Sequence, residues 1–326
     1  MPTVAARRSR AVTLLILATM VWGLSFPIIK TLGLIQRQLL PGSGTWLVTA
    51  CTVAPRFLVA GVLLALWGAR DLSRLTWLEA KQGAGLALFA GLGLLLQVDG
   101  LQSTAASVSA FLTQLYAVLI PLYVALRTRR RPTAAVLVAC VLVVAGVAVL
   151  GRVEWGAVRL GRGELETIAG SLFFMAQILW LERKEFAGNG VLRTSTVMFL
   201  VLGGAFAAGA LVLAPQASAL VVLVSSPGWV GLTLLLTAAC TVFCFVVMNA
   251  CQPKVTATEA GLIYALEPVS ASALALVLPA VFSAWTGIAY ANEVPTWHLL
   301  VGGALLTAAN VVVLRPWVRA AAQTAV

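Results

Sequence analysis

Long apolar segments recur along almost the whole chain, and they restrict its fold more than any other feature. A helix needs on the order of 20 consecutive apolar residues to cross a bilayer, and about ten such segments follow one another here. Hydrophobic residues make up 61% of the 326 positions and charged residues only 10%. The sequence therefore predicts an all-α integral membrane protein. The expected spans are Ala11–Ile35, Thr45–Trp67, Lys81–Val98, Thr104–Leu126, Thr133–Leu150, Glu164–Leu181, Thr194–Leu213, Trp229–Ala250, Ala257–Ala280 and Thr296–Leu314.

Two other interpretations of these segments fit less well. Strands of a membrane β-barrel alternate apolar and polar residues, whereas runs such as VLVACVLVVAGVAVL (Val136–Leu150) are apolar on every side. The basic residues before Ala11 resemble the start of a signal peptide, but the apolar run continues past Trp22 to Ile35 without an A-x-A-like site. We therefore expect the first segment to be a membrane span.

The net charge of +11 raises the question of a nucleic-acid partner. When the N-terminus is placed inside, most Lys and Arg residues fall on the cytoplasmic side. The few on the other side are Lys30, Arg37, Arg152, Arg159 and Arg162. This positive-inside bias predicts a multi-pass protein of the cell (inner) membrane with both termini in the cytoplasm. We interpret the basic cluster RTRRRP (127–132) as an anchor at anionic lipid head groups and expect no nucleic-acid partner.

Cysteine and histidine usage argues against several enzyme classes. All five cysteines lie in or at the ends of apolar segments, where they suit packing, and His298 is the single histidine. A zinc site of the H-E-x-x-H type is excluded, and no metal or other cofactor is expected. We find no convergent nucleophile and base for an intramembrane enzyme and no nucleotide-binding loop for direct ATP use.

A weak internal repeat divides the chain. DGLQSTAASVSAFLTQLYAV (Asp99–Val118) aligns without gaps with ACQPKVTATEAGLIYALEPV (Ala250–Val269), and both stretches place a polar turn before a helix. Each lies in the fourth helix of a five-helix half. An odd number of spans per half makes the halves opposite in orientation. The sequence thus predicts ten helices as two inverted five-helix repeats, at residues 1–155 and 156–326, in one membrane unit.

Three stretches resemble the drug/metabolite transporter superfamily and, within it, the EamA-type ten-helix exporters. ATMVWGLSFPIIK (Ala18–Lys30) is similar to the first helix of the family, and APRFLVAGVLLAL (Ala54–Leu66) to the second. LIYALEPVSASALAL (Leu262–Leu276) is similar to the ninth helix, whose glutamate-proline pair is its most recognisable feature. A Gly-Glu that often follows in the family is replaced here by a longer stretch before Glu293, so no site role is carried over to that residue.

The resemblance implies a carrier that moves small metabolites, commonly amino acids or related compounds, outward through a central cavity by alternating access. Polar residues at membrane depth point independently to such a cavity, because they are costly unless they face protein, water or ligand. Arg56 and Glu267 each fall roughly ten residues into their segments, near the bilayer midplane. They are expected either to pair across the cavity or to bind the two ends of a zwitterionic substrate. A purely structural ion pair is an equal alternative.

Six further residues are candidate substrate-binding residues because they are polar or aromatic and lie within the spans. They are Trp22, Ser25, Gln97, Gln114, Gln177 and Tyr264. Tyr264 precedes Glu267 by three residues, so its hydroxyl could orient the carboxylate. Gln97 and Gln177 are placed nearer the two ends of the pathway. For Gln114, hydrogen bonding to a neighbouring helix is an equally good explanation.

Two prolines are predicted hinges. Pro27 follows Trp22 and Ser25, and Pro268 follows Glu267. Since proline lacks an N–H group, the carbonyl one turn earlier loses its partner and the helix is weakened there. Protons carried by Glu267 or Asp99 could drive transport, and facilitated diffusion fits equally well; Asp99 itself is expected to be solvated at an outer helix end. A polar-pore channel and a non-transporting membrane scaffold are the alternative functions.

Overall fold

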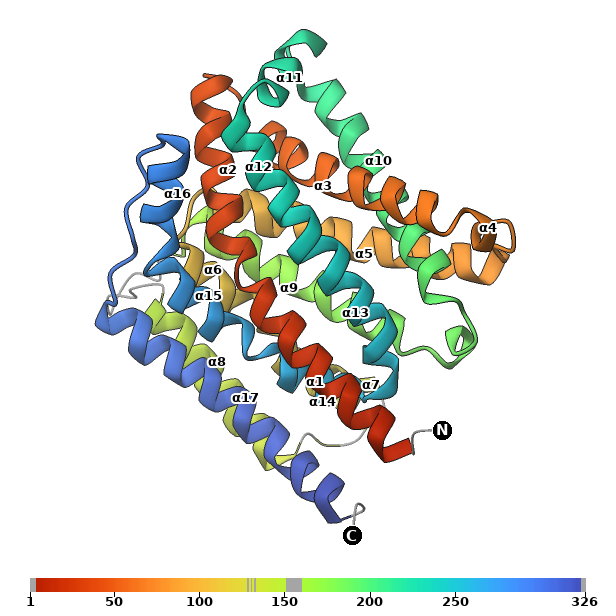
Figure 1. The fold of residues 1–326 in the computed structure, drawn as a ribbon. Helices are drawn as coiled ribbons and strands as arrows, with labels where there is room; N and C mark the ends of the chain where they lie inside the picture. Colours follow the sequence, from red (N-terminus) through yellow and green to blue (C-terminus); the bar gives the residue numbers. More distant parts are fainter. Residues whose placement is uncertain (1–3, 128, 130, 132, 151–159, 324–326) are drawn as a thin grey trace.

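The structure is a computed structural model that describes residues 4–127, 129, 131, 133–150 and 160–323. The predicted boundary between the halves, at 155 and 156, and the basic residues Arg130, Arg152 and Arg159 lie outside the described residues. Every regular element of the described chain is a helix (Figure 1). In chain order the elements are α1 Val4–Trp22, α2 Ser25–Leu39, α3 Thr45–Trp67, α4 Ala69–Leu72, α5 Trp77–Leu101, α6 Ala106–Thr113, α7 Tyr116–Arg127, α8 Ala134–Leu150, α9 Arg162–Leu181, the 3-10 helix η1 Lys184–Phe186, α10 Val191–Leu213, α11 Ala217–Val224, α12 Pro227–Leu235, the π-helical segment η2 Leu236–Phe243, α13 Cys244–Cys251, the 3-10 helix η3 Gln252–Lys254, α14 Ala257–Tyr264, α15 Glu267–Ala275, α16 Leu278–Thr286 and α17 Trp297–Gln323.

Seven helical stretches are long and apolar enough to cross a membrane, judged by length and composition. The bent pair α15 and α16 would make an eighth, and α8 and residues 297–312 of α17 are shorter apolar helices. A helical protein with multiple candidate spans is thus confirmed, whereas the arrangement of ten spans stays a prediction. The seven stretches are Arg8–Leu39, Thr45–Trp67, Trp77–Leu101, Ala106–Arg127, Arg162–Leu181, Val191–Leu213 and Pro227–Lys254.

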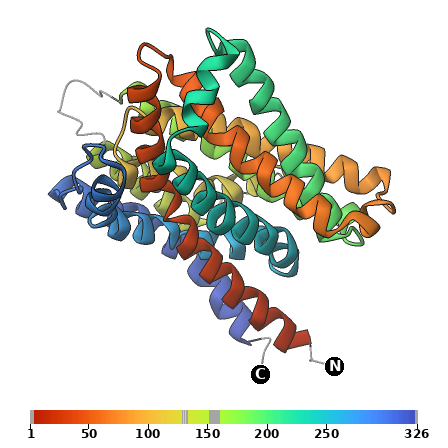
Figure 2. The same ribbon diagram turned by 45° about the horizontal axis from the view of Figure 1, so that its top comes forward.

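Four uninterrupted helices form one side of the bundle. Helix α3 packs on α10, and α5 packs on both α9 and α10 (Figures 1 and 2). Glycines allow the closest of these contacts. A Cβ atom added to Gly100 of α5 would lie 2.6 Å from the carbonyl oxygen of Gly163, and one on Gly163 would lie 2.5 Å from that of Gly100. The two backbones therefore touch where α5 and α9 meet, as is common between membrane helices.

Helices α8 and α17 pack together at the opposite edge of the bundle (Figure 1). The outer surface of α8 is apolar, and Val141 and Val144 on it are each 69% exposed. An exposed aliphatic surface of this kind suits lipid rather than water. Helix α1 begins and α17 ends at the same end of the bundle (Figure 2), as an even number of spans requires.

The predicted first span is interrupted. Helix α1 ends at Trp22 and α2 begins at Ser25, so the predicted span Ala11–Ile35, which lies within the candidate span Arg8–Leu39, is broken just before Pro27. Proline clashes with the carbonyl of the residue four positions earlier, which for Pro27 is Gly23, inside the break. Gly23 also fits a tight site, since a Cβ atom there would lie 2.7 Å from the backbone nitrogen of Ala271.

The predicted ninth span is likewise interrupted, and twice. Helix α14 ends at Tyr264, four residues before Pro268, and α15 ends at Ala275, four residues before Pro279. The axes of α15 and α16 differ by 53°. The helix over Ala257–Ala280 is therefore broken at two points, and the first break lies just before the predicted hinge Pro268. By contrast, Pro55 and Pro121 lie inside the continuous helices α3 and α7.

The two stretches that align in the sequence also fold alike. Helices α6 and α14 are both eight residues long, and each is followed by a two-residue break, at 114–115 and 265–266. In the ungapped alignment their first residues, Ala106 and Ala257, coincide, and so do Tyr116 and Glu267, where the following helices begin. The repeat is therefore visible in local structure and in a few sequence identities.

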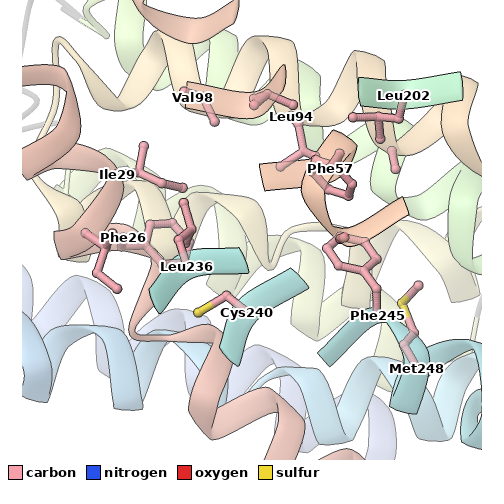
Figure 3. Close-up of a cluster of buried hydrophobic side chains, with 14 of the residues drawn as sticks. Phe26, Ile29, Phe57, Leu94, Val98, Leu202, Leu236, Cys240, Phe245 and Met248 are labelled. Atoms are coloured by element: carbon pink, nitrogen blue, oxygen red, sulfur yellow. The ribbon is translucent and has the colours of Figure 1, made fainter. Parts of the chain in front are cut away.

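A large apolar core lies beside the uninterrupted helices. Figure 3 shows Phe57 of α3 beside Phe245 of α13, and the centroids of the two rings are 5.5 Å apart. Leu236 and Cys240 of the π-helical segment face Phe26 and Ile29 of α2 in the same view. The core thus joins α2 and α3 to the span that contains the π-helical segment, and the cavity described next opens beside it.

Candidate functional site

One cavity brings together charged, amide, hydroxyl and aromatic side chains from several helices. The space between its walls that no atoms fill is about 580 Å³, part of it open to solvent. Its walls come from both interrupted and uninterrupted helices, namely α1, α2, α3, α5, α6, α7, α9, α13, α14 and α15. The lining residues are Trp22, Ser25, Ile29, Arg56, Leu94, Gln97, Thr113, Tyr116, Phe174, Gln177, Ile178, Phe245, Met248, Tyr264 and Glu267.

All but one of the predicted substrate-binding residues line this cavity. Trp22, Ser25, Arg56, Gln97, Gln177, Tyr264 and Glu267 do so. The exception is Gln114, which is 2% exposed and contacts the carboxylate of Glu267. The structure thus brings the set together, while its role in substrate binding stays a prediction.

Arg56 is a buried cation on the cavity wall. Its side chain extends from the middle of α3 and is 2% exposed. The Nε–H group donates to Oγ1 of Thr241 at 3.1 Å, and the guanidinium carbon lies 4.8 Å from the ring centroid of Phe57. Within the described chain, Nη1 is buried and has no hydrogen-bond partner. A buried cation that is only partly paired is costly, so this nitrogen is a natural place for a ligand acceptor.

Glu267 is the first residue of α15, directly after the break that follows α14. Its Oε2 atom accepts a hydrogen bond from Nε2 of Gln114 at 2.9 Å. No Lys or Arg nitrogen of the described residues forms an ion pair with it. The direct Arg56–Glu267 pair is therefore not formed here, because each charged group has a neutral partner of its own and both border the cavity.

Tyr264 does not orient Glu267 as predicted. Its hydroxyl donates to Oε1 of Gln252 at 2.9 Å. The prediction assumed a continuous helix in which residues three apart share a face. The break at Ala265 and Leu266 removes that geometry, and the amide of Gln114 contacts the carboxylate instead.

Trp22 forms an aromatic wall at the end of α1. Its indole Nε1–H donates to the carbonyl oxygen of Cys240 at 2.9 Å. Its ring lies edge-on to Phe245, with centroids 5.2 Å apart, and to Tyr264, with centroids 5.8 Å apart. Ser25 is the first residue of α2 and lies across the break from Trp22. The interruption before Pro27 thus places both side chains on the cavity.

Two glutamines contribute polar groups to the same cavity. Nε2 of Gln97 donates to Oγ1 of Thr113 at 2.9 Å, and Nε2 of Gln177 lies 3.9 Å from Sδ of Met248. Both amides border the cavity that also contains Arg56 and Glu267.

The analysis of the sequence did not single out Thr241 or the aromatic residues Tyr116, Phe174 and Phe245. Thr241 had a usable signal, since it is polar and lies within an apolar segment. The aromatic residues had none, because apolar side chains fill every span. Their place on the wall depends on packing between distant segments.

Two charged residues outside the cavity form contacts that the sequence did not predict. Asp99 is 3% exposed and pairs with Arg162, so the prediction that it is solvated is wrong. Its burial follows from the contact of α5 with α9, which brings Arg162 over it. Glu293 accepts from the backbone N–H of Ala106 at 2.7 Å and from the hydroxyl of Ser107, and it thereby caps α6.

Metal ligands do not cluster in the described part of the chain. No group of three or more His, Cys, Asp or Glu side chains there could hold a metal ion. The cavity instead offers a cation, a carboxylate, amides, hydroxyls and aromatic rings. This composition suits noncovalent binding of a small polar molecule.

Comparisons with known proteins agree with this picture. Among solved structures, 22 chains match. One of them, titled only as the crystal structure of a protein, is 19% identical, covers 94% of this chain and 96% of its own, and has a TM-score of 0.58. The fold is therefore shared over nearly the full length. The comparison with curated proteins found no match. Residues 9–152 match the family model of the EamA-like transporter family.

Proposed function

We propose that the protein is a secondary transporter that exports small zwitterionic metabolites, namely amino acids or related compounds. The observation that carries this proposal is the separation of Arg56 and Glu267 on the wall of one cavity. Each is buried, and each has a neutral hydrogen-bond partner instead of a countercharge. A ligand with a carboxylate and an ammonium group would supply both missing charges.

The energetics favour such a ligand over an empty site. An ion at membrane depth costs several kcal/mol unless it is paired. Nη1 of Arg56 has no partner within the described chain, and a carboxylate is its best acceptor. The carboxylate of Glu267 would take the ammonium group, while Trp22 and Tyr264 would contact the remainder of the molecule.

Alternating access is proposed on the basis of the repeat. We propose ten spans in two inverted five-helix halves, residues 1–155 and 156–326. The matching breaks at 114–115 and 265–266 support this division, because inverted repeats place interrupted helices at the binding site. Pro27 and Pro268 would serve as hinges, since each follows a break whose side chains border the cavity.

The proposal also covers the orientation of the protein in the membrane and the energy source for transport. The bias of Lys and Arg toward one side supports cytoplasmic termini in the cell (inner) membrane, with lipid around the bundle. Protons are a candidate coupling ion, because a buried carboxylate without a countercharge is stabilised by either a proton or a ligand cation. Facilitated diffusion would use the same binding site without this step.

The direct test is counterflow in proteoliposomes that contain the purified protein. Labelled amino acids are supplied outside and the unlabelled compound inside, for the parent protein and for Glu267→Gln. We expect saturable exchange of one class of amino acid and its loss in Glu267→Gln. Glu185→Gln is the matched control, since Glu185 pairs with Lys81 and Arg183 away from the cavity.

Flux that grows linearly with concentration would favour a channel, and it would contradict the carrier proposal. Absence of exchange for every amino acid, with folded protein verified by size-exclusion chromatography, would contradict the proposed substrate class. Equal exchange by Glu267→Gln and the parent would contradict the role of Glu267.

A further inference from the structure

The two charged residues of the cavity are held in the same manner. Arg56 belongs to the first half of the chain (α1–α8) and is held by Thr241 of the second half (α9–α17). Glu267 belongs to the second half and is held by Gln114 of the first. The partners are 185 and 153 positions apart in sequence. Both contacts thus join the two halves. In one the charged residue belongs to the first half, and in the other it belongs to the second.

Each contact also includes a residue at an irregular point of a helix. Thr241 lies in the π-helical segment between α12 and α13, and such segments are frequent at functional sites. Gln114 lies in the break between α6 and α7, and Glu267 directly follows the break between α14 and α15. Movement at these interruptions would change the positions of the guanidinium and the carboxylate.

The geometry at Arg56 is directional. The hydroxyl of Thr241 donates its own proton to the carbonyl oxygen of Leu236, five residues earlier, at 3.2 Å. Its oxygen is therefore oriented to accept from Nε of Arg56 at 3.1 Å. With Nε held there, the planar guanidinium has one orientation, and Nη1 keeps no partner within the described chain.

The geometry at Glu267 is equivalent. Nε2 of Gln114 donates to Oε2 at 2.9 Å, and both residues are buried. A neutral amide fixes the carboxylate without cancelling its charge. Both hydrogen bonds therefore position a charged group and leave its charge available to a ligand.

We propose that Thr241 and Gln114 are positioning residues that couple the two charged groups to the arrangement of the interrupted helices. This inference rests on the proposed transport function. Its kinetic readout depends on the proposed substrate class, whereas its conformational readout depends on alternating access alone. In the arrangement seen here both contacts are formed. Removing either one weakens ligand binding and destabilises this arrangement relative to the other arrangement of the proposed alternating-access cycle.

The kinetic experiment is proteoliposome counterflow of the amino acid that the parent exchanges. Thr241→Val removes the hydroxyl and keeps the volume, and we expect it to raise KM about tenfold, since the bond to a charged group is lost. Thr241→Ser restores the hydroxyl and should return KM to near the parent value. Thr237→Val is the matched control, because within the described chain the hydroxyl of Thr237 donates to the carbonyl of Thr233 one turn earlier.

The conformational experiment measures the labelling of Ser25→Cys, a probe on the cavity wall, by a membrane-impermeant thiol reagent added to one side of the vesicle or the other. Peptide mass spectrometry at position 25 separates this label from the native cysteines. We expect Thr241→Val and Gln114→Leu to shift the ratio of labelling from the two sides in the same direction. Gln36→Leu is the control for Gln114, since Gln36 is buried and bonds to Thr52 away from the cavity.

The outcomes separate the two proposals. If no amino acid is exchanged, the substrate class fails, and the labelling ratio still decides the present inference. An unchanged ratio in either variant, or shifts in opposite directions, overturns the coupling. A KM for Thr241→Val equal to that for Thr237→Val overturns the positioning of Arg56.

Discussion

The indole Nε1–H of Trp22 donates a hydrogen bond to the carbonyl oxygen of Cys240, with 2.9 Å between the two atoms. The bond joins the end of α1 to the π-helical segment. The thiol of Cys240 in turn lies 3.5 Å from the carbonyl oxygen of Val21, so the contact is formed from both sides. The first break and the π-helical segment are therefore fixed to one another at the cavity wall.

Replacing Trp22 should separate the roles of its ring and its N–H group. Trp22→Phe keeps most of the edge-on contacts but loses the hydrogen bond, which should lower the free energy of unfolding by about 1 kcal/mol. Trp22→Ala removes the ring as well and should cost about 3–5 kcal/mol. Thermal unfolding in detergent measures both. Trp77→Phe is the control, because Trp77 is 82% exposed. A Trp22→Phe variant as stable as this control would contradict the structural role of the bond.

The separation of Arg56 and Glu267 predicts the result of a double-mutant cycle. Since they do not pair directly, the stability effects of Arg56→Met and Glu267→Leu should be additive within about 0.5 kcal/mol. In counterflow, the double variant should be as inactive as either single variant. A double variant that is more stable than the sum of the two single effects predicts, or more active than the singles, would instead indicate a structural ion pair.

Much of the helical framework could be predicted from hydropathy. The predicted span Thr45–Trp67 has the same bounds as α3, and the other uninterrupted helices differ by a few residues at their ends. These predictions succeed because a spanning helix needs a long run of consecutive apolar residues, and such a run can be recognised within one segment of the sequence. The breaks were harder to place. Pro27 and Pro268 interrupt their spans, whereas Pro55 and Pro121 do not, so proline alone does not decide the outcome.

The composition of the cavity wall was also accessible, because polar residues in apolar segments are rare and costly. This argument found Arg56, Glu267 and Gln177. It did not find how the groups contact one another, since Thr241 reaches Arg56 from 185 positions away. Nothing in the sequence signalled the π-helical segment. Helical spacing indicated that the hydroxyl of Tyr264 could orient Glu267, and a break of two residues invalidates that spacing.

Pro268→Ala tests the break before Glu267. The substitution restores an N–H group and removes the clash with the carbonyl of Tyr264, so α14 and α15 should tend to join. We expect slower counterflow with a melting temperature equal to or above that of the parent. Pro121→Ala is the control, since Pro121 lies inside the continuous helix α7. An exchange rate equal to that of the control would contradict the proposed hinge.

Gly100→Ala tests the backbone contact between α5 and α9. The new methyl group would lie 2.6 Å from the carbonyl oxygen of Gly163, and backbone atoms on both helices would have to move. Overpacking of this kind should cost about 1–3 kcal/mol in the free energy of unfolding. The control is Gly204→Ala in α10, where a Cβ atom meets nothing within 4 Å. Both substitutions change the unfolded chain equally, so the difference between their melting temperatures isolates the contact. Equal melting temperatures would show that α5 and α9 do not depend on this close approach.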